Sequence, residues 1–231
     1  MYKSGSNNQV ILKGEIVEEF APYSWEGELK ELCKTTLKVE RLSSECDYVP
    51  VVMTKSMAES KKVGQTLAVL GEYRSRNIKT QTKSKLELVV LALSELETSS
   101  VLSDASNIVS LTGFVCKNVI YRTTPFGRDI SDILLAVNRG HNKSDYIPCI
   151  AWSTNALVAS KFVVGDMLSI IGRIQSRVYH KKLDSGEIED KIAYEISIIK
   201  IEKLKNSERE RLKDFFTEKL ENVVVKYNAN T

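Results

Sequence analysis

The chain has 231 residues, of which 42% are hydrophobic, so it is long enough for one large domain or two small ones with packed cores. Its formal net charge of +3 is too small to indicate a polyanionic partner by itself, so a nucleic-acid site must be argued from where the charges lie. Four cysteines without a CxxC pair and only two histidines argue against a zinc cluster, and we expect reduced thiols and no cofactor.

The N-terminal residues MYKSGSNNQ contain no apolar signal region. No stretch of the sequence approaches the roughly 18 apolar residues that a membrane helix needs. We therefore expect a soluble, cytoplasmic protein.

The first predicted strand contains a pattern that returns later in the chain. Residues 8–16 read NQVILKGEI and residues 107–115 read NIVSLTGFV, so both fit N-x-V-x-L-x-G-x-[IV] at an offset of 107 − 8 = 99. The next two strands repeat at an offset of 135 − 37 = 98: LKVER (37–41) and DYVP (47–50) match LAVNR (135–139) and DYIP (145–148).

The last two predicted strands repeat as well. VGQTLAVLGEYRSR (63–76) matches VGDMLSIIGRIQSR (164–177) at 164 − 63 = 101, and LVVLALSEL (88–96) is aligned with ISIIKIEKL (196–204) at 196 − 88 = 108. The seven additional residues, 108 − 101, are assigned to one loop. Ordered matches over about 95 residues indicate one duplicated domain. We call residues 8–96 copy one and residues 107–204 copy two.

Alternating apolar residues predict about five half-buried strands in each copy. Residues 55–64 and 154–165 read as short helical stretches between the third and fourth strands, and Gly14, Gly71, Gly113 and Gly172 lie inside strands, where glycine permits a bulge or bend. This layout is that of the OB-fold, a partly open five-stranded barrel. The predicted fold class is therefore all-β, with two tandem OB-fold barrels.

The predicted domain limits follow from the repeat. We assign residues 1–97 to the first, divergent barrel, 98–106 to a linker, 107–205 to the second barrel and 206–231 to a C-terminal helix and tail. The helix is predicted because Leu212, Phe216, Leu220 and Val223 share one helical stripe.

Copy two resembles the bacterial single-stranded DNA-binding protein family. The resemblance rests on NIVSLTGFV, LLAVNR, DYIPCIAW and VGDMLSIIGRIQSRVY, in that order over residues 107–204, and copy one matches more loosely. It implies a tandem OB-fold chain that coats unwound DNA in replication, recombination and repair. Members of the family typically end in an acidic tail that recruits other enzymes, whereas this chain ends VVVKYNANT, so that role is not carried over.

The candidate stacking residues are aromatic. Tyr146 and Trp152 are six residues apart and share one face of a strand if no bulge intervenes, and Tyr179 opens a long polar loop. All three fall where the resemblance places base-stacking aromatics. Other interpretations remain open: Tyr146 could be a core tyrosine and Tyr179 a solvent-facing residue at a strand end.

Candidate phosphate contacts lie at predicted strand ends and loops in both copies. In copy two they are Arg122, Arg128, Arg139, Arg173, Arg177, Lys181 and Lys182. In copy one they are Arg41, Arg74, Arg76, Lys79, Lys83 and Lys85, with Tyr48 as the counterpart of Tyr146. Such charges are often only a solvated face, but basic residues along a hairpin can follow a phosphate backbone.

The two copies are predicted to differ in stacking. At the position of Trp152 copy one has Thr54 (152 − 98 = 54), and at the position of Tyr179 it has Ile78 (179 − 101 = 78). Copy two is therefore expected to be the main stacking surface. Tyr23 and Trp25 could partly replace the missing rings or could cap the barrel.

The leading hypothesis is sequence-independent binding of single-stranded DNA. Two alternatives remain: an OB-fold interaction scaffold of a primosome or recombination complex, and binding of single-stranded RNA. An enzyme is not expected, because the sequence offers no Ser/His/Asp arrangement and no phosphate-binding loop. Because members of the family generally present four barrels, we expect a homodimer, with a monomer as the alternative.

Overall fold

The computed structural model describes residues 7–25, 31–79, 84–140, 143–182, 186 and 188–204. The predicted C-terminal helix in residues 206–231 lies outside this part. Among the described helices, none is long and apolar enough to cross a membrane.

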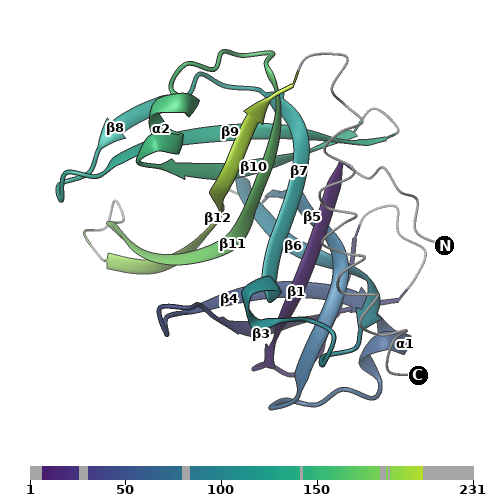
Figure 1. The fold of residues 1–231 in the computed structure, drawn as a ribbon. Coiled ribbons are helices and arrows are strands. Elements are labelled where there is room, and N and C mark those ends of the chain that lie inside the picture. Colours follow the sequence, from purple (N-terminus) through teal and green to yellow (C-terminus); the bar gives the residue numbers. More distant parts are fainter. Residues whose placement is uncertain are drawn as a thin grey trace.

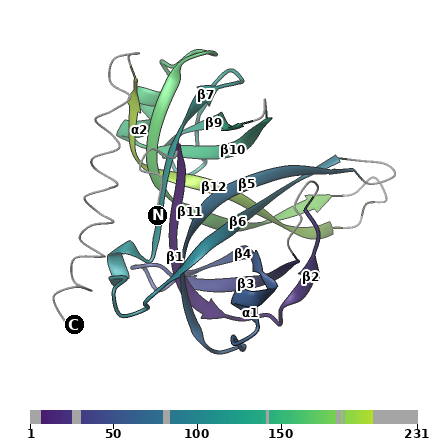
Figure 2. The ribbon, with the colours of Figure 1, turned by 90° about the vertical axis from the view of Figure 1, so that its right-hand side faces the viewer.

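Each copy forms six strands and one short helix (Figures 1 and 2). Copy one contains β1 (Asn8–Ile16), β2 (Ala21–Tyr23), β3 (Leu32–Glu40), β4 (Cys46–Thr54), α1 (Lys55–Ala58), β5 (Thr66–Lys79) and β6 (Ser84–Leu96). Copy two contains β7 (Asn107–Val115), β8 (Ile120–Thr123), β9 (Asp129–Gly140), β10 (Lys143–Trp152), α2 (Thr154–Ala159), β11 (Met167–Lys182) and β12 (Ile188–Lys203). The five predicted strands and the helix between the third and fourth are present in both; β2 and β8 are short additions that the sequence analysis did not predict.

The strands form because apolar residues alternate along them. In β7, Val109, Leu111 and Val115 are at most 1% exposed, whereas Ser110, Thr112 and Phe114 on the other face are more exposed. A period of two places these side chains on one face of the strand, toward the barrel interior. Within each barrel the ladder also includes one parallel pair, β4 with β6 and β10 with β12.

The two barrels are joined by their first strands. The sheet runs in the order β2-β3-β4-β6-β5-β1-β7-β11-β12-β10-β9-β8, so β1 and β7 lie at its centre. They pair antiparallel from Asn8 opposite Leu111 to Leu12 opposite Asn107. Val10 lies opposite Val109, and these two residues occupy the same position in the repeat. The pairing is therefore close to two-fold symmetric.

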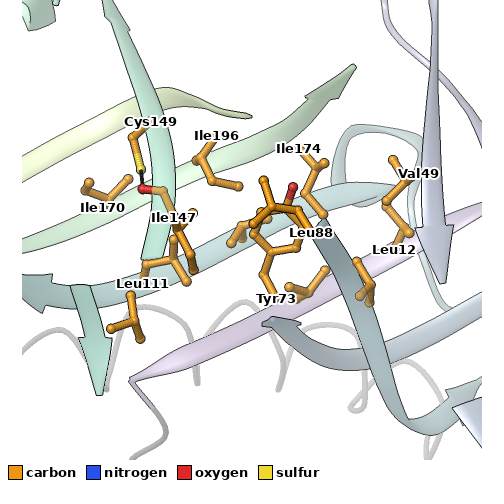
Figure 3. Close-up of a cluster of buried hydrophobic side chains, with 14 of the residues drawn as sticks. Leu12, Val49, Tyr73, Leu88, Leu111, Ile147, Cys149, Ile170, Ile174 and Ile196 are labelled. Atoms are coloured by element: carbon orange, nitrogen blue, oxygen red, sulfur yellow. Dashed lines mark hydrogen bonds between the residues drawn. The ribbon is translucent and has the colours of Figure 1, made fainter. Parts of the chain in front are cut away.

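The hydrophobic core is continuous across the two copies, with Tyr73 at the junction (Figure 3). In Figure 3 the Tyr73 ring lies near Leu88 of copy one and near Ile174 and Ile196 of copy two. Tyr73 is 0% exposed, and within the described part of the chain its hydroxyl has no hydrogen-bond partner. Burial raises the pKa of this phenol well above its ordinary value. Because the core is shared, the predicted domain division stays a prediction.

Glycine is required where one strand crosses another closely. The ladder shifts register between Leu70 and Gly71 and again between Ile171 and Gly172, which confirms a bulge at two of the four glycines; the ladders pass through Gly14 and Gly113 without a shift. A Cβ on Gly71 would lie 2.3 Å from the carbonyl oxygen of Leu91, closer than any side chain tolerates. Gly172 has the equivalent close approach in copy two. These positions exclude every residue that has a side chain.

The alignment of the last strands at an offset of 108 was wrong. Val51 pairs with Val90 in copy one and Cys149 pairs with Ile196 in copy two. The partners in β4 and β10 differ by 149 − 51 = 98, and those in β6 and β12 differ by 196 − 90 = 106. A slip of two residues leaves every side chain on the same face, so hydrophobic alternation could not distinguish 106 from 108.

Candidate nucleic-acid interface

The outward face of β10 carries two aromatic rings. Asp145, Ile147 and Cys149 point inward and are at most 2% exposed, whereas Tyr146 is 45% exposed and Trp152 half-buried. Between Ser144 and Trp152 the β9–β10 ladder has no register shift, so the two rings share one face, as their spacing predicts. The aromatic surface is therefore built on a rigid, fully paired strand.

A third ring on this surface was missed by the sequence analysis. Phe114 of β7 pairs with Ala136 of β9, which pairs in turn with Tyr146 of β10. Residues directly opposite in a ladder share a face, so Phe114 and Tyr146 flank a small alanine in one cross-strand row. Phe114 is 42% exposed although it is fully apolar. Its alternation with buried neighbours in NIVSLTGFV was the available sequence signal.

Tyr179 and Tyr48 are also exposed. Tyr179 lies on β11, opposite Lys191 of β12, and is 37% exposed. Tyr48 of β4 is 44% exposed, which matches its counterpart Tyr146. The backbone N–H of Tyr48 donates to Ser176 Oγ of copy two at 2.9 Å, and that of Tyr146 donates to Ser75 Oγ of copy one at 2.7 Å. The backbones of Tyr48 and Tyr146 are thus each held partly by the other copy.

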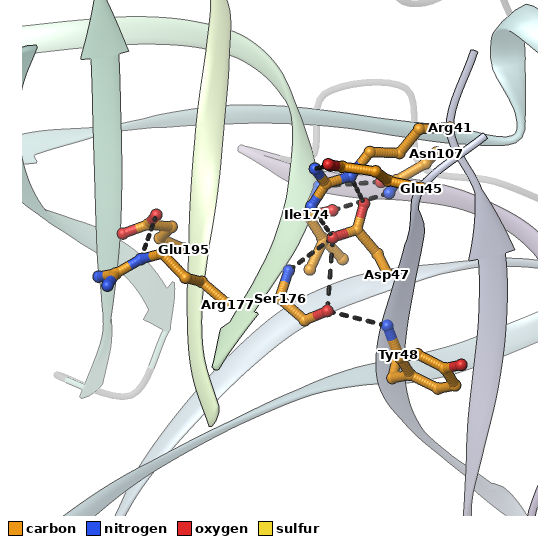
Figure 4. Close-up of polar contacts among 9 residues, drawn as sticks. All are labelled: Arg41, Glu45, Asp47, Tyr48, Asn107, Ile174, Ser176, Arg177 and Glu195. Carbon is orange, nitrogen blue, oxygen red and sulfur yellow. Dashed lines mark hydrogen bonds and ion pairs between the residues drawn. The ribbon is translucent and has the colours of Figure 1, made fainter. Parts of the chain in front are cut away.

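Two buried aspartates complete the contact between the copies. Asp47 is 0% exposed and accepts hydrogen bonds from the backbone N–H of Ser176 at 2.7 Å and from Nε and Nη2 of Arg41 at 2.7 and 2.6 Å (Figure 4). Asp145, equally buried, accepts from the backbone N–H of Ser75 at 2.8 Å and from Arg74 Nη1 at 2.9 Å. A buried carboxylate requires such partners.

Three arginines predicted to contact phosphates therefore lie in ion pairs at this contact. Arg41 and Arg74 bind the aspartates directly, and Arg139 Nη1 lies 3.4 Å from Asp145 Oδ1. Whether they also contact phosphate stays a prediction. The available sequence signal for this contact was the recurrence of an Asp-Tyr dipeptide and a Ser-Arg dipeptide at the same places in both copies, since the aspartates and serines form it.

Two of the other predicted cations, Arg122 and Arg177, lie on the outer surface. Arg122 Nε is 3.0 Å from Asp132, and Arg177 Nε is 3.8 Å from Glu195. Burial raises the pKa of the Glu195 carboxyl. Arg173 is half-buried, and burial together with the nearby charge of Arg41 lowers its pKa.

The basic hairpin ends are described only in part. Lys79, Lys181 and Lys182 end their strands, but their side chains lie outside the described structure, and Lys83 is entirely outside it. No group of three or more histidine, cysteine or carboxylate side chains that could hold a metal occurs within the described residues.

A second aromatic cluster lies in copy one. The Tyr23 and Trp25 ring centroids are 6.1 Å apart with planes at 45°. The Arg76 guanidinium lies 4.6 Å from the Tyr23 centroid and 5.2 Å from the Trp25 centroid. Glu87 accepts hydrogen bonds from Tyr23 Oη at 2.7 Å, Arg76 Nε at 2.6 Å and Lys34 Nζ at 2.7 Å. Burial opposes ionisation of Glu87, but these three donors outweigh it and lower its pKa.

Comparison with known proteins agrees with this geometry. Residues 106–204 match the single-strand binding protein family. Over 80 residues the chain is 38% identical to single-stranded DNA-binding protein 2 of Listeria innocua, covering 32% of this chain and 50% of that protein. Over 83 residues it is 35% identical to single-stranded DNA-binding protein 1 of Streptococcus pyogenes, covering 33% of this chain and 64% of that protein. The chain spans about half the length of most curated relatives that it matches.

The likeness in fold extends over both copies. The crystal structure of the single-stranded DNA binding protein from Thermus aquaticus matches with a TM-score of 0.67 and 22% identity, covering 86% of this chain and 93% of that chain. This coverage includes copy one, which the family match does not reach. The second copy, residues 106–204, is therefore similar in sequence to the single-strand binding protein family, and both copies share the fold of the Thermus aquaticus protein.

Proposed function

We propose that this protein binds single-stranded DNA with little sequence preference and serves in replication, recombination or repair. The observation that carries the proposal is the set of three aromatic rings on the outward face of copy two. Tyr146, Phe114 and Trp152 are held on paired strands whose alternate residues are fully buried. Exposed aromatic faces on a rigid surface allow unpaired bases of any sequence to stack, at about 1–3 kcal/mol per base.

The charges around these rings support the same proposal. Arg122, Arg173 and Arg177 lie on strands that border the outward face, and β11 ends at Lys181 and Lys182. Stacking neutralises no phosphate, so a binding surface for a nucleic acid strand needs such cations as well. This combination is that of a binding protein rather than an enzyme, and we propose the cytoplasm as its location.

A titration with fluorescently labelled oligo-dT tests the proposal. We expect tight binding at low salt, weaker binding as salt increases, and much weaker binding of duplex DNA of equal length. Tyr146→Ala and Trp152→Ala should each weaken binding by roughly five- to hundred-fold. The matched control is Tyr121→Ala, because Tyr121 is 42% exposed but lies opposite the buried Ser131, on the other face of the sheet from Trp152. Equal binding of duplex and single strand would refute the proposal, and preference for oligo-U would favour the RNA alternative.

We further propose that two chains associate to present four barrels. The proposal rests on the family resemblance and on the closed symmetry that one two-fold axis provides. The chain mass is 26.0 kDa, so light scattering should report about twice that mass, 52 kDa. A mass near 26.0 kDa at working concentration would leave the protein a monomer with two barrels.

A further inference from the structure

The cross-strand row that contains Trp152 in copy two has different residues in copy one. In copy one, Tyr23 of β2 pairs with Leu32 of β3, which pairs with Thr54 of β4. In copy two the equivalent row is Arg122, Ile130 and Trp152. Residues opposite each other in a ladder share a face, so Tyr23 lies on the face that carries Tyr48. In copy two the aromatic ring of this row is Trp152 on the third predicted strand, whereas in copy one it is Tyr23 on the short strand β2 at the opposite end of the row.

The copy-one rings are fixed in place by charged side chains. Arg76 lies against both Tyr23 and Trp25, and Glu87 holds Arg76 and the Tyr23 hydroxyl together. A second hydrogen bond, from Arg76 Nη1 to the carbonyl oxygen of Ser24 at 2.6 Å, fixes the segment between the two rings. Both rings also pack on a small apolar cluster of Leu32, Val52 and Val89. Rings held in this way lose little conformational entropy when a ligand stacks on them.

The cluster is not part of the scaffold that the two copies share. Tyr23 corresponds to Arg122 through the β2 and β8 ladders, and Lys34 corresponds to Asp132. Glu87 corresponds to Ala193, because each lies opposite the matching arginine, Arg76 or Arg177. Copy two forms the same barrel without any of these groups, so the barrel does not require them as a cap.

The cluster also borders copy two. The Arg139 guanidinium lies 5.9 Å from the Trp25 centroid and 3.4 Å, through Nη1, from Asp145, the residue before Tyr146. Trp25 therefore lies beside an arginine of copy two.

We infer that Tyr23 and Trp25 form a second stacking platform, on which copy one binds an unpaired nucleobase of the same strand that copy two holds. The inference rests on the proposed function and replaces the expectation that copy one contributes mainly charge. Arg76 and Arg139 provide cations beside the platform, as a phosphate backbone requires. Single-stranded nucleic acid thus contacts aromatic rings in both barrels.

The two tryptophans of the chain, Trp25 and Trp152, allow a direct test. In full-length Trp152→Phe, Trp25 is the only tryptophan, so its fluorescence reports the platform alone. Unlabelled oligo-dT should quench Trp25 with the same midpoint that anisotropy of a labelled oligo-dT gives. Binding by anisotropy with unchanged Trp25 fluorescence would overturn the inference and leave the proposed function intact. If the wild-type chain does not bind oligo-dT at all, both fall together.

A second variant separates stacking from a structural role. Trp25→Leu retains apolar contact with the cluster below it and removes the aromatic face. We expect binding to weaken by roughly five- to hundred-fold, by the same factor at low and high salt, since stacking releases no counterions. The thermal unfolding midpoint should stay close to wild type. Affinity equal to that of wild type, or a loss accompanied by a matching loss of stability, would make Trp25 a cap and refute the platform.

Discussion

Replacement of Ser75 by alanine isolates one hydrogen bond between the two copies. Ser75 Oγ accepts the backbone N–H of Tyr146 at 2.7 Å, and Ser75 is 5% exposed. The backbone N–H of Ser75 still donates to Asp145 in the variant, because that contact does not involve the side chain. Only the Tyr146 N–H then lacks an acceptor. A buried donor without a partner costs about 1–3 kcal/mol.

The expected loss is measurable by thermal unfolding followed by circular dichroism. For a chain of this size each kcal/mol lowers the midpoint by about 2–4 °C, so Ser75→Ala should lower it by roughly 2–12 °C. Ser176→Ala, the equivalent change beside Tyr48, should cost less because Ser176 is half-buried and water can replace the hydroxyl. Ser160→Ala, at an exposed site after α2, is the control and should change stability by less than about 0.5 kcal/mol.

This reasoning fails on either of two results. If Ser75→Ala melts within about 1 °C of wild type, the contact between the copies does not depend on the hydroxyl acceptor. If Ser176→Ala is the more destabilising change, burial of the serine is not what sets the size of the effect. In the first case the contact would rest on the β1–β7 pairing, the shared core and the buried aspartates.

Four other changes test separate parts of the structure. Gly71→Ala should prevent or severely weaken folding, since its Cβ would lie 2.3 Å from the carbonyl oxygen of Leu91; a midpoint within a few degrees of wild type, seen by the same thermal scan, would contradict the close approach. Tyr73→Phe should leave stability unchanged or raise it, because the buried hydroxyl has no hydrogen-bond partner among the described residues, and a loss above about 1 kcal/mol in urea unfolding would reveal an unseen partner. Glu87 has a pKa below its ordinary 4.5 in the folded chain, so its stabilisation is complete above pH 4.5 and lost as pH falls through the folded-state value. Glu87→Gln should therefore flatten the decline of the melting midpoint below pH 4.5, and an unchanged pH profile would exclude Glu87 as its source. Phe114→Ala should weaken oligo-dT binding by roughly five- to hundred-fold with little change in stability, and wild-type affinity would show that no base stacks there.

The sequence by itself determined the duplication, the strands and the face on which the candidate rings lie. These features are local: alternation with a period of two decides which residues face the core, and Tyr146 and Trp152 are separated by an even number of residues on an unbroken ladder. The helices between the third and fourth predicted strands follow from the same reading of local pattern. The close approaches at Gly71 and Gly172 were also signalled locally, by glycine inside a strand.

Only the tertiary structure decided which residues of one copy meet the other. The sequence analysis assigned no role to the serine that precedes Arg76 and Arg177, whereas Ser75 and Ser176 accept the backbone N–H groups of Tyr146 and Tyr48 across the junction. Which strand pairs with which between copies is not encoded in the alternation of either strand. A register slip of two residues in the last strand is equally invisible, because it returns every side chain to the same face. The partners of Asp47 and Asp145 follow from the antiparallel pairing of β1 with β7, which places equivalent positions of the two copies around one two-fold axis.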